Sequence, residues 1–224
     1  MDFVKNPKVI EDKSMAIIYD YVKDLGLTAD EVRVVSRTIH ASGDVEYAKL
    51  VRMSPTAVQQ GIDALNNGAH VYTDVEMVRT GISKPALALH NSEVHCLIRD
   101  EEVAKMAKEL GVTRSIAAMR TFGKKLDGQI VAIGNAPTAL YEVLRLALEE
   151  GVKPALIIGI PVGFVGAAES KEYLADISPV PFITVEGNKG GSPIAAAVVN
   201  ALLYTDVKRN DMLFVEGKEI RSRG

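Results

Sequence analysis

The second half of the chain repeats one pattern of hydrophobic and polar positions three times. In each repeat, a short apolar run precedes a turn rich in Gly, Pro or Asn, and a stretch with helical periodicity follows. The repeats cover residues 131–151, 154–174 and 181–204. Continuously apolar strands are typical of a sheet that is covered on both faces. Three strand–turn–helix units, spaced roughly 25 residues apart, predict a parallel sheet with crossover helices.

The first half has a more mixed pattern. Apolar positions within 10–25 predict a helix whose core side is formed by Ile17, Ile18, Tyr21, Val22 and Leu25. Thr28 and Glu31 have the spacing of a capping box, so a second helix is expected to begin there and to end near Gly43. The remaining expected elements are a helix from Ser54 to Asn67, strands at 70–73 and 94–98, and a helix over 100–110.

These elements predict a three-layer α/β domain, with a mostly parallel sheet between helix layers. No low-complexity tract or Pro- and Ser-rich linker divides the chain. We therefore expect a single domain over residues 1–206, followed by a charged C-terminal extension over residues 207–224.

Composition narrows the class of protein. Of the 224 residues, 47% are hydrophobic and 25% are charged, which is the usual balance of a globular protein. The net charge of −3 argues against nucleic-acid binding as the main activity. No apolar run approaches the ~18 residues of a membrane span, and the charged start does not resemble a signal peptide. A cytoplasmic protein without membrane contact is expected.

Metal and disulfide sites are not expected. Cys96 is the only cysteine, which excludes an intrachain disulfide and any site built from several cysteines. His90, His95 and Cys96 lie close together in the sequence, but His90 and His95 would point to opposite faces of a strand. Cys96 fits a small core residue better than a ligand.

Polar residues gather where the predicted strands end. Ligands of open parallel sheets bind at this edge, where loops lead into helix N-termini. GNAPT (134–138) offers Asn135 and Thr138, and GNKGGS (187–192) offers Lys189, Gly190, Gly191 and Ser192. Free N–H groups and the helix dipole favour an anion there, although the same residues can simply form turns. The nucleotide fingerprints are missing, so a carboxylate or an isolated phosphate is a better ligand than a dinucleotide.

RTIHASGD (37–44) is the best candidate for acid–base chemistry. Arg37 and His40 are three residues apart and share one face of the predicted helix. A histidine near a helix end, with Arg and acidic groups around it, can donate a proton at neutral pH. The same pattern also fits a histidine that interacts only with the end of the helix.

Several long motifs resemble one known family. RTIHASGD, TDVEMVRTGI (73–82), TRSIAAMR (113–120), GFVGAAESKE (163–172) and KGGSPIAA (189–196) are similar to segments of the precorrin-8X methylmutases of cobalamin biosynthesis. The resemblance covers about residues 10–204, in the same order. It implies a flavodoxin-like fold and a homodimer with its active sites at or near the subunit interface. It also implies an isomerase that moves a methyl group from carbon 11 to carbon 12 of the corrin-forming macrocycle.

The resemblance also implies site residues. The catalytic histidine of the family falls on His40, and substrate contacts fall on Ser14, Arg37 and Arg120. A Met follows Ser14 where Phe is more usual. The substrate carries several carboxylate arms, and on this electrostatic ground Arg52 and Lys189 are added. No cofactor and no protein-bound metal are implied, because any cobalt would be carried by the substrate.

Two alternatives remain at this point. A non-catalytic carrier of the same pathway would use the same pocket to hold the product and hand it to a neighbouring enzyme. A flavodoxin-like nucleotide binder is disfavoured by the missing fingerprints. His40 favours catalysis, because a carrier needs cations more than it needs a proton donor.

Overall fold

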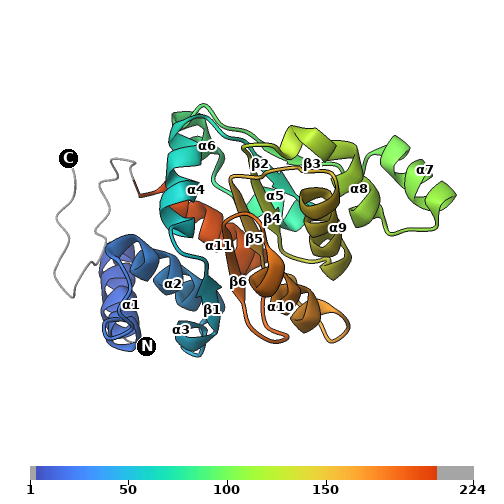
Figure 1. The fold of residues 1–224 in the computed structure, drawn as a ribbon. Helices are drawn as coiled ribbons and strands as arrows, with labels where there is room; N and C mark the ends of the chain where they lie inside the picture. The colour runs from blue at the N-terminus through green and yellow to red at the C-terminus, as the bar shows by residue number, and fades with distance from the viewer. Residues whose placement is uncertain (1–3, 206–224) are drawn as a thin grey trace.

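The computed structural model describes residues 4–205. A six-stranded sheet forms its centre, with helices on both faces (Figure 1). The strands follow the order β1-β6-β5-β4-β2-β3, and all neighbouring pairs are parallel except β1 with β6. Without β1, this is the strand order of flavodoxin-like folds, so the predicted three-layer α/β fold is confirmed. The strands are β1 (Val51–Met53), β2 (Val71–Thr73), β3 (Val94–Cys96), β4 (Ile130–Ile133), β5 (Leu156–Gly159) and β6 (Phe182–Val185).

The helices divide into two layers. One layer contains α1 (Pro7–Val22), α2 (Ala29–Ser42), α4 (Ala57–Asn66), α5 (Glu76–Gly81), α6 (Lys84–Leu89) and α11 (Ser192–Leu203). The other contains α7 (Glu101–Leu110), α8 (Arg114–Phe122), α9 (Pro137–Glu149) and α10 (Ala167–Ile177). The short helix α3 (Tyr47–Leu50) leads into β1, and a 3₁₀ turn, η1 (Gly123–Leu126), precedes β4.

The central strands are buried on both faces. In β4, Ile130 and Ala132 pack into the core below α11, whereas Val131 and Ile133 pack into the core below α9. The side chains of a strand point alternately to the two faces, so one continuous apolar run supplies both cores. This confirms the prediction made from the three apolar runs.

The predicted helix at 28–43 is confirmed in detail. The Thr28 hydroxyl accepts a hydrogen bond from the Glu31 N–H, and the Glu31 carboxylate accepts one from the Thr28 N–H at 2.8 Å. Gly43 ends α2 with a φ of 67°, a left-handed conformation that glycine adopts without strain. Asp100 likewise caps α7, as the predicted helix over 100–110 requires.

The prediction for the core side of the first helix is wrong in part. Ile18 and Val22 are buried, but the side chains of Ile17, Tyr21 and Leu25 are exposed, Ile17 by 63%. The physical reason is the place of α1: it is the outermost helix of its layer and lies against α2 at one end of the molecule (Figure 1). Only a narrow face of α1 is therefore covered within the described residues.

Other differences concern short elements. The helix expected from Ser54 begins only at Ala57, because Ser54 still pairs with β6: its N–H donates to the Phe182 carbonyl at 3.0 Å. The pattern did not predict β1, α3, α5, α6 or α8, which are short or lack a clear period. The predicted extension over 207–224 lies outside the described residues.

Candidate active site

The three predicted loops lie at one edge of the sheet. Because β4, β5 and β6 are parallel neighbours, the loops that follow them begin at the same edge. We call this the carboxyl edge. Helices α9, α10 and α11 begin there, which confirms the arrangement expected from the sequence.

Three N–H groups of the first of these loops are already paired within the chain. Asp74 follows β2 and is fully buried, and its carboxylate accepts hydrogen bonds from the N–H groups of Gly134, Asn135 and Ala136 at 3.0, 2.9 and 2.7 Å. Burial raises the pKa of Asp74, although the three N–H donors oppose that shift. The expectation that the GNAPT backbone binds a substrate anion is therefore wrong, because the chain supplies its own carboxylate.

Side chains of the first loop remain near this edge. Asn135 is exposed, and the Thr138 hydroxyl lies 3.0 Å from that of Thr113. The sequence offered one signal for Asp74 that was missed: an acidic residue directly after a short apolar strand. A carboxylate in that position can cap the helix that follows the neighbouring strand.

The other two loops have no side-chain cap at their helices. Gly166 precedes α10 and Gly191 precedes α11, and among residues 4–205 no side chain accepts a capping hydrogen bond from the first N–H groups of either helix. Gly190 has a φ of 150°, and a Cβ there would lie 2.7 Å from the Ile160 carbonyl oxygen. Ser192 is the first residue of α11. The 187–192 loop thus fits closely over the end of β5, with the positive end of α11 behind it.

His40 lies shortly before a segment that contacts this loop. It is exposed in the last turn of α2, and Asp44 and Glu46 follow four and six residues later. The Lys189 ammonium forms ion pairs with both carboxylates. Through these pairs, hydrogen bonding to Lys189 keeps the pKa of Asp44 below its usual range. The segment that follows α2, starting four residues after His40, is therefore joined directly to the 187–192 loop.

Two more predicted residues lie on the α1–α2 pair. Arg37 donates a hydrogen bond to the Glu11 carboxylate at 3.0 Å, and the Ser14 hydroxyl donates one to the Ile10 carbonyl at 2.8 Å. α1 and α2 are successive antiparallel helices. Along the helix axes, the Arg37–Glu11 contact therefore lies between the position of Ser14 and that of His40. Ser14, Arg37 and His40 thus lie on one pair of helices, and within residues 4–205 no hydrogen bond joins Ser14 to His40.

Arg120 is not brought together with His40. Its guanidinium donates two hydrogen bonds to Glu142, at 2.8 and 3.1 Å, between α8 and α9 in the opposite helix layer. Burial alone would raise the pKa of Glu142, but Arg120 and Arg145 lower it further than burial raises it. Within one chain, the sheet separates Arg120 and Thr138 from His40.

From the sequence, four basic side chains were expected to be available for substrate carboxylates. In the structure, each of them already forms an ion pair with a carboxylate of the protein. Arg37, Arg52, Arg120 and Lys189 are paired with Glu11, Glu186, Glu142 and the Asp44–Glu46 pair, respectively. Arg52 lies on β1 and is half-exposed, 3.4 Å from Glu186. A substrate carboxylate would have to share these cations with carboxylates of the protein. The half-exposed Arg52–Glu186 pair is of the weak kind, so sharing Arg52 costs little.

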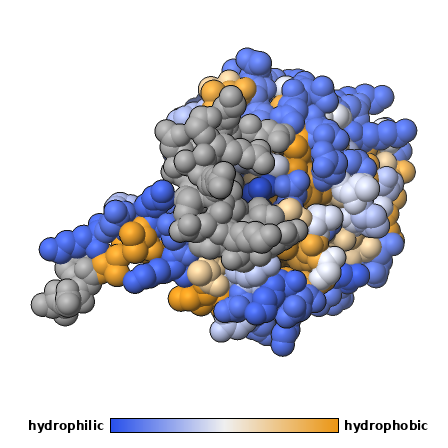
Figure 2. Space-filling model, turned by 90° about the vertical axis from the view of Figure 1, so that its left-hand side faces the viewer, coloured by the Kyte–Doolittle hydropathy of each residue, from blue (hydrophilic) through white to orange (hydrophobic). Residues whose placement is uncertain are grey.

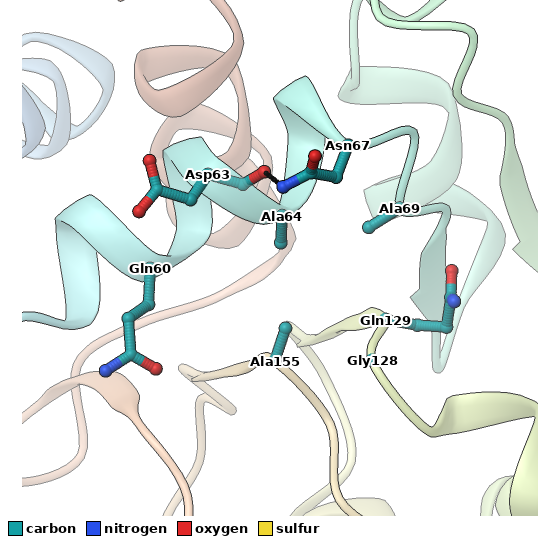
Figure 3. Close-up of a pocket in the computed structure, with 8 residues that line it drawn as sticks. All are labelled: Gln60, Asp63, Ala64, Asn67, Ala69, Gly128, Gln129 and Ala155. Carbon is teal, nitrogen blue, oxygen red and sulfur yellow. Dashed lines mark hydrogen bonds between the residues drawn. The ribbon is translucent and has the colours of Figure 1, made fainter.

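A hollow of about 370 Å³ lies elsewhere (Figure 3). Gln60 and Asp63 of α4 and Asn67, which follows the helix, line one side of it, and Gln129 and Ala155 line the other. Gln129 and Ala155 precede β4 and β5, so this hollow is at the opposite edge of the sheet from His40. It is shallow and contains none of the predicted site residues.

Within residues 4–205, no group of three His, Cys, Asp or Glu side chains has the arrangement of a metal site. His90 caps α6 and contacts the Leu203 carbonyl, whereas His95 lies on β3. In the same range, no helix has the length and apolar character needed to cross a bilayer.

Comparison with known proteins identifies the family. Residues 9–205 match the family described as precorrin-8X methylmutase. Cobalt-precorrin-8 methylmutase of Priestia megaterium is 45% identical, covering 88% of this chain and 87% of the relative, and precorrin-8X methylmutase of Pseudomonas aeruginosa is 43% identical, covering 90% and 97%. The crystal structure of precorrin-8x methyl mutase from Thermus thermophilus superposes with a TM-score of 0.80 at 40% identity, covering 87% of this chain and 94% of that one. The chain therefore belongs to the precorrin-8X methylmutase family, whose members are isomerases that move a methyl group within their substrate.

Proposed function

We propose that the protein converts precorrin-8X, or its cobalt form, by moving a methyl group from carbon 11 to carbon 12 of the macrocycle, with His40 as the general acid. The observation that carries this proposal is the position of His40. It is exposed at the end of α2, and Lys189 joins that end to the uncapped start of α11. A proton donor thus lies beside a region suited to carboxylate groups.

The proposed reaction is balanced without a co-reactant. The bond between the methyl group and carbon 11 breaks as the bond to carbon 12 forms, so the substrate is both methyl donor and acceptor. Protonation of the macrocycle by His40 near ring C raises the electron demand of the conjugated system, and the proton returns to His40 when the product forms. No redox change occurs, which is why we propose that no cofactor takes part. Cobalt, where present, is part of the substrate.

Binding supplies the second contribution. A general acid contributes on the order of 10²–10⁴-fold, and fixing a rigid substrate in one orientation can contribute more. We assign orientation to Ser14, Arg37, Arg52, Lys189 and the 190–192 backbone. The substrate's acetate and propionate arms suit cations that are already partly exposed.

Arg120, Asn135 and Thr138 enter this proposal differently. Arg120 and Thr138 lie across the sheet from His40, so contact with the same substrate molecule requires a second subunit. We propose a homodimer in which each site draws on both chains. The exposed apolar side chains of α1, including Ile17 and Tyr21, support an interface on this side. Figure 2 views this side and shows hydrophobic residues exposed among hydrophilic ones.

The function is tested by following the absorption spectrum during anaerobic incubation with precorrin-8X and, separately, with its cobalt form. Conversion to the product chromophore by the wild type and its loss in H40A support the proposal. H95A is the matched control, because His95 lies on β3 at the far end of the sheet. Normal conversion by folded H40A would refute the role of His40. Binding without conversion of either substrate by the wild type would indicate a carrier.

The shared site is tested by mixing two inactive variants. H40A and R120A are unfolded together, refolded, and assayed for conversion. If each site uses both chains, half of the dimers are hybrids with one intact site each, so about a quarter of the wild-type activity returns. R120A alone should bind the substrate more weakly, so that it shows little conversion at the low substrate concentration of this assay, and it should keep its oligomeric state. No recovery in the mixture would place all the essential residues of a site on one chain.

A further inference from the structure

Lys171 is a buried cation that the proposed mechanism does not use. It lies on α10 with 2% of its surface exposed, and the same side of the helix buries Ala167, Ser170 and Leu174. Removing an ammonium group from water is unfavourable unless hydrogen bonds replace the lost hydration. Burial accordingly lowers the pKa of Lys171 to about 8. A lysine in such a place requires a specific partner.

The partner of Lys171 belongs to the 187–192 loop. Its Nζ donates a hydrogen bond to the Lys189 carbonyl oxygen at 2.6 Å. Two further contacts hold the same loop from below: the Gly191 N–H donates to the Ile160 carbonyl at 2.9 Å, and the Gly163 N–H donates to the Asn188 carbonyl at 3.2 Å. Of these three hydrogen bonds, only the one from Lys171 has a charged donor. Hydrogen bonds that involve a charged group are stronger than those between neutral groups.

Lys189 extends this contact to the other side of the loop. Its carbonyl faces Lys171, whereas its own ammonium forms ion pairs with Asp44 and Glu46. The residue after Asp44 and Glu46, Tyr47, is buried and bonds to the backbone of Gly190. A continuous series of contacts therefore runs from Lys171 through the loop to the segment that follows α2.

This series ends next to the proposed acid. The Ser42 hydroxyl accepts a hydrogen bond from the Asp44 N–H at 3.1 Å and donates one to the Thr38 carbonyl at 2.9 Å. Asp44 is thereby fixed to the last turn of α2, which carries His40. A shift of Lys189 is transmitted to that turn without any direct contact between Lys171 and His40.

We propose that Lys171 is a positioning residue for the methylmutase reaction: its ammonium fixes the 187–192 loop and, through Lys189 and Asp44, the end of α2 that carries His40. This inference rests on the proposed role of His40. Lys171 touches neither substrate nor proton, so its contribution is to orientation. A displacement of about 1 Å at a reacting group can lower a rate on the order of 10²-fold.

The first test compares K171M with the wild type in the conversion assay. Met has nearly the length of the Lys side chain, but it lacks the charge and cannot donate a hydrogen bond to the Lys189 carbonyl. We expect kcat to fall on the order of 10²-fold and KM to change much less, because orientation is lost while the binding groups remain. K153M is the control, since Lys153 is exposed beyond the opposite edge of the sheet. A folded K171M with wild-type kcat overturns the proposal.

The second test needs no substrate. In K171M, amide hydrogen exchange should become faster both in the 188–192 loop and in residues 41–46, and remain unchanged in α7. Faster exchange confined to α10 would mean a local packing role and overturn the proposal. This measurement separates failure of the inference from failure of the proposed function, which would instead appear as absence of conversion by the wild type.

The third test uses a double-mutant cycle. K189M breaks the ion pairs to Asp44 and Glu46. If Lys171 acts through Lys189, the double variant K171M/K189M should lose little more kcat than the stronger single variant. If the fold-loss of kcat in the double variant equals the product of the two single fold-losses, the two residues act independently. That result would contradict the proposed series of contacts.

Discussion

Replacing Asp74 should destabilise the protein more than replacing an ordinary helix cap. In D74A, the N–H groups of Gly134, Asn135 and Ala136 lose a buried acceptor together. An unsatisfied buried group costs about 1–3 kcal/mol, and the smaller side chain also leaves a cavity. Since relaxation restores part of this loss, we expect the free energy of unfolding to fall by about 4 kcal/mol.

Asp100 provides a matched control. It caps α7 with the same side chain, but it is exposed and accepts one N–H bond, from Val103 at 3.0 Å. Loss of such a cap typically costs about 1 kcal/mol, because water replaces the carboxylate. The difference between D74A and D100A therefore measures the effect of burial and of the two additional bonds, with the chemical change held constant.

Urea unfolding at pH 7, followed by far-ultraviolet circular dichroism, measures both variants. D74N should fall between D74A and the wild type, because it keeps the volume and one acceptor oxygen but turns an amide N–H₂ toward backbone donors. An equal loss for D74A and D100A, of about 1 kcal/mol, would refute the reasoning. It would show that water can replace the carboxylate as hydrogen-bond acceptor at the start of α9 as readily as at the start of α7.

Two further predictions concern the 187–192 loop. Gly190→Ala places a Cβ within 2.8 Å of two backbone carbonyl oxygens and should lower stability by about 1–3 kcal/mol, whereas Gly187→Ala, with open space around it, should cost less by thermal melting. For Lys171, the folded pKa of about 8 lies below the ordinary value of 10.5, so the unfolded chain binds more protons between these pH values. The stability of the wild type relative to K171M should therefore rise by about 3 kcal/mol from pH 8 to 10.5 in urea titrations. A pH-independent difference would show that Lys171 titrates alike in both states.

Local signals predicted most of the central architecture. The three apolar runs predicted β4, β5 and β6 and their common carboxyl edge. A strand that is covered on both faces is apolar at every position, so it does not alternate between polar and apolar residues. Thr28 and Gly43 marked both ends of α2, since capping depends on residues close in sequence. The helix that carries His40 was therefore placed correctly before its surroundings were known.

The surroundings of the site could not be predicted in the same way. Whether Lys189 is free or paired depends on Asp44 and Glu46, which precede it by more than a hundred residues. The three-residue strand β1 is too short for a period, although it sets the position of Arg52. A signal for Lys171 was present in the sequence but was missed. Ala167, Lys171 and Leu174 have the i, i+4, i+7 spacing of one helix face, and because that face is apolar, a lysine on it is expected to be buried.

The pairing of β1 with β6 has a consequence for synthesis of the chain. Val51 pairs with Val185, and α2 packs against the last helix of the described residues, α11. β1 and α2 therefore cannot contact β6 and α11 until nearly the whole polypeptide has left the ribosome. Contacts between such distant segments slow folding and leave apolar surface exposed meanwhile. Nascent chains that stop before β6 should be clients of chaperones, and the segment that carries His40 should be among the last to become ordered.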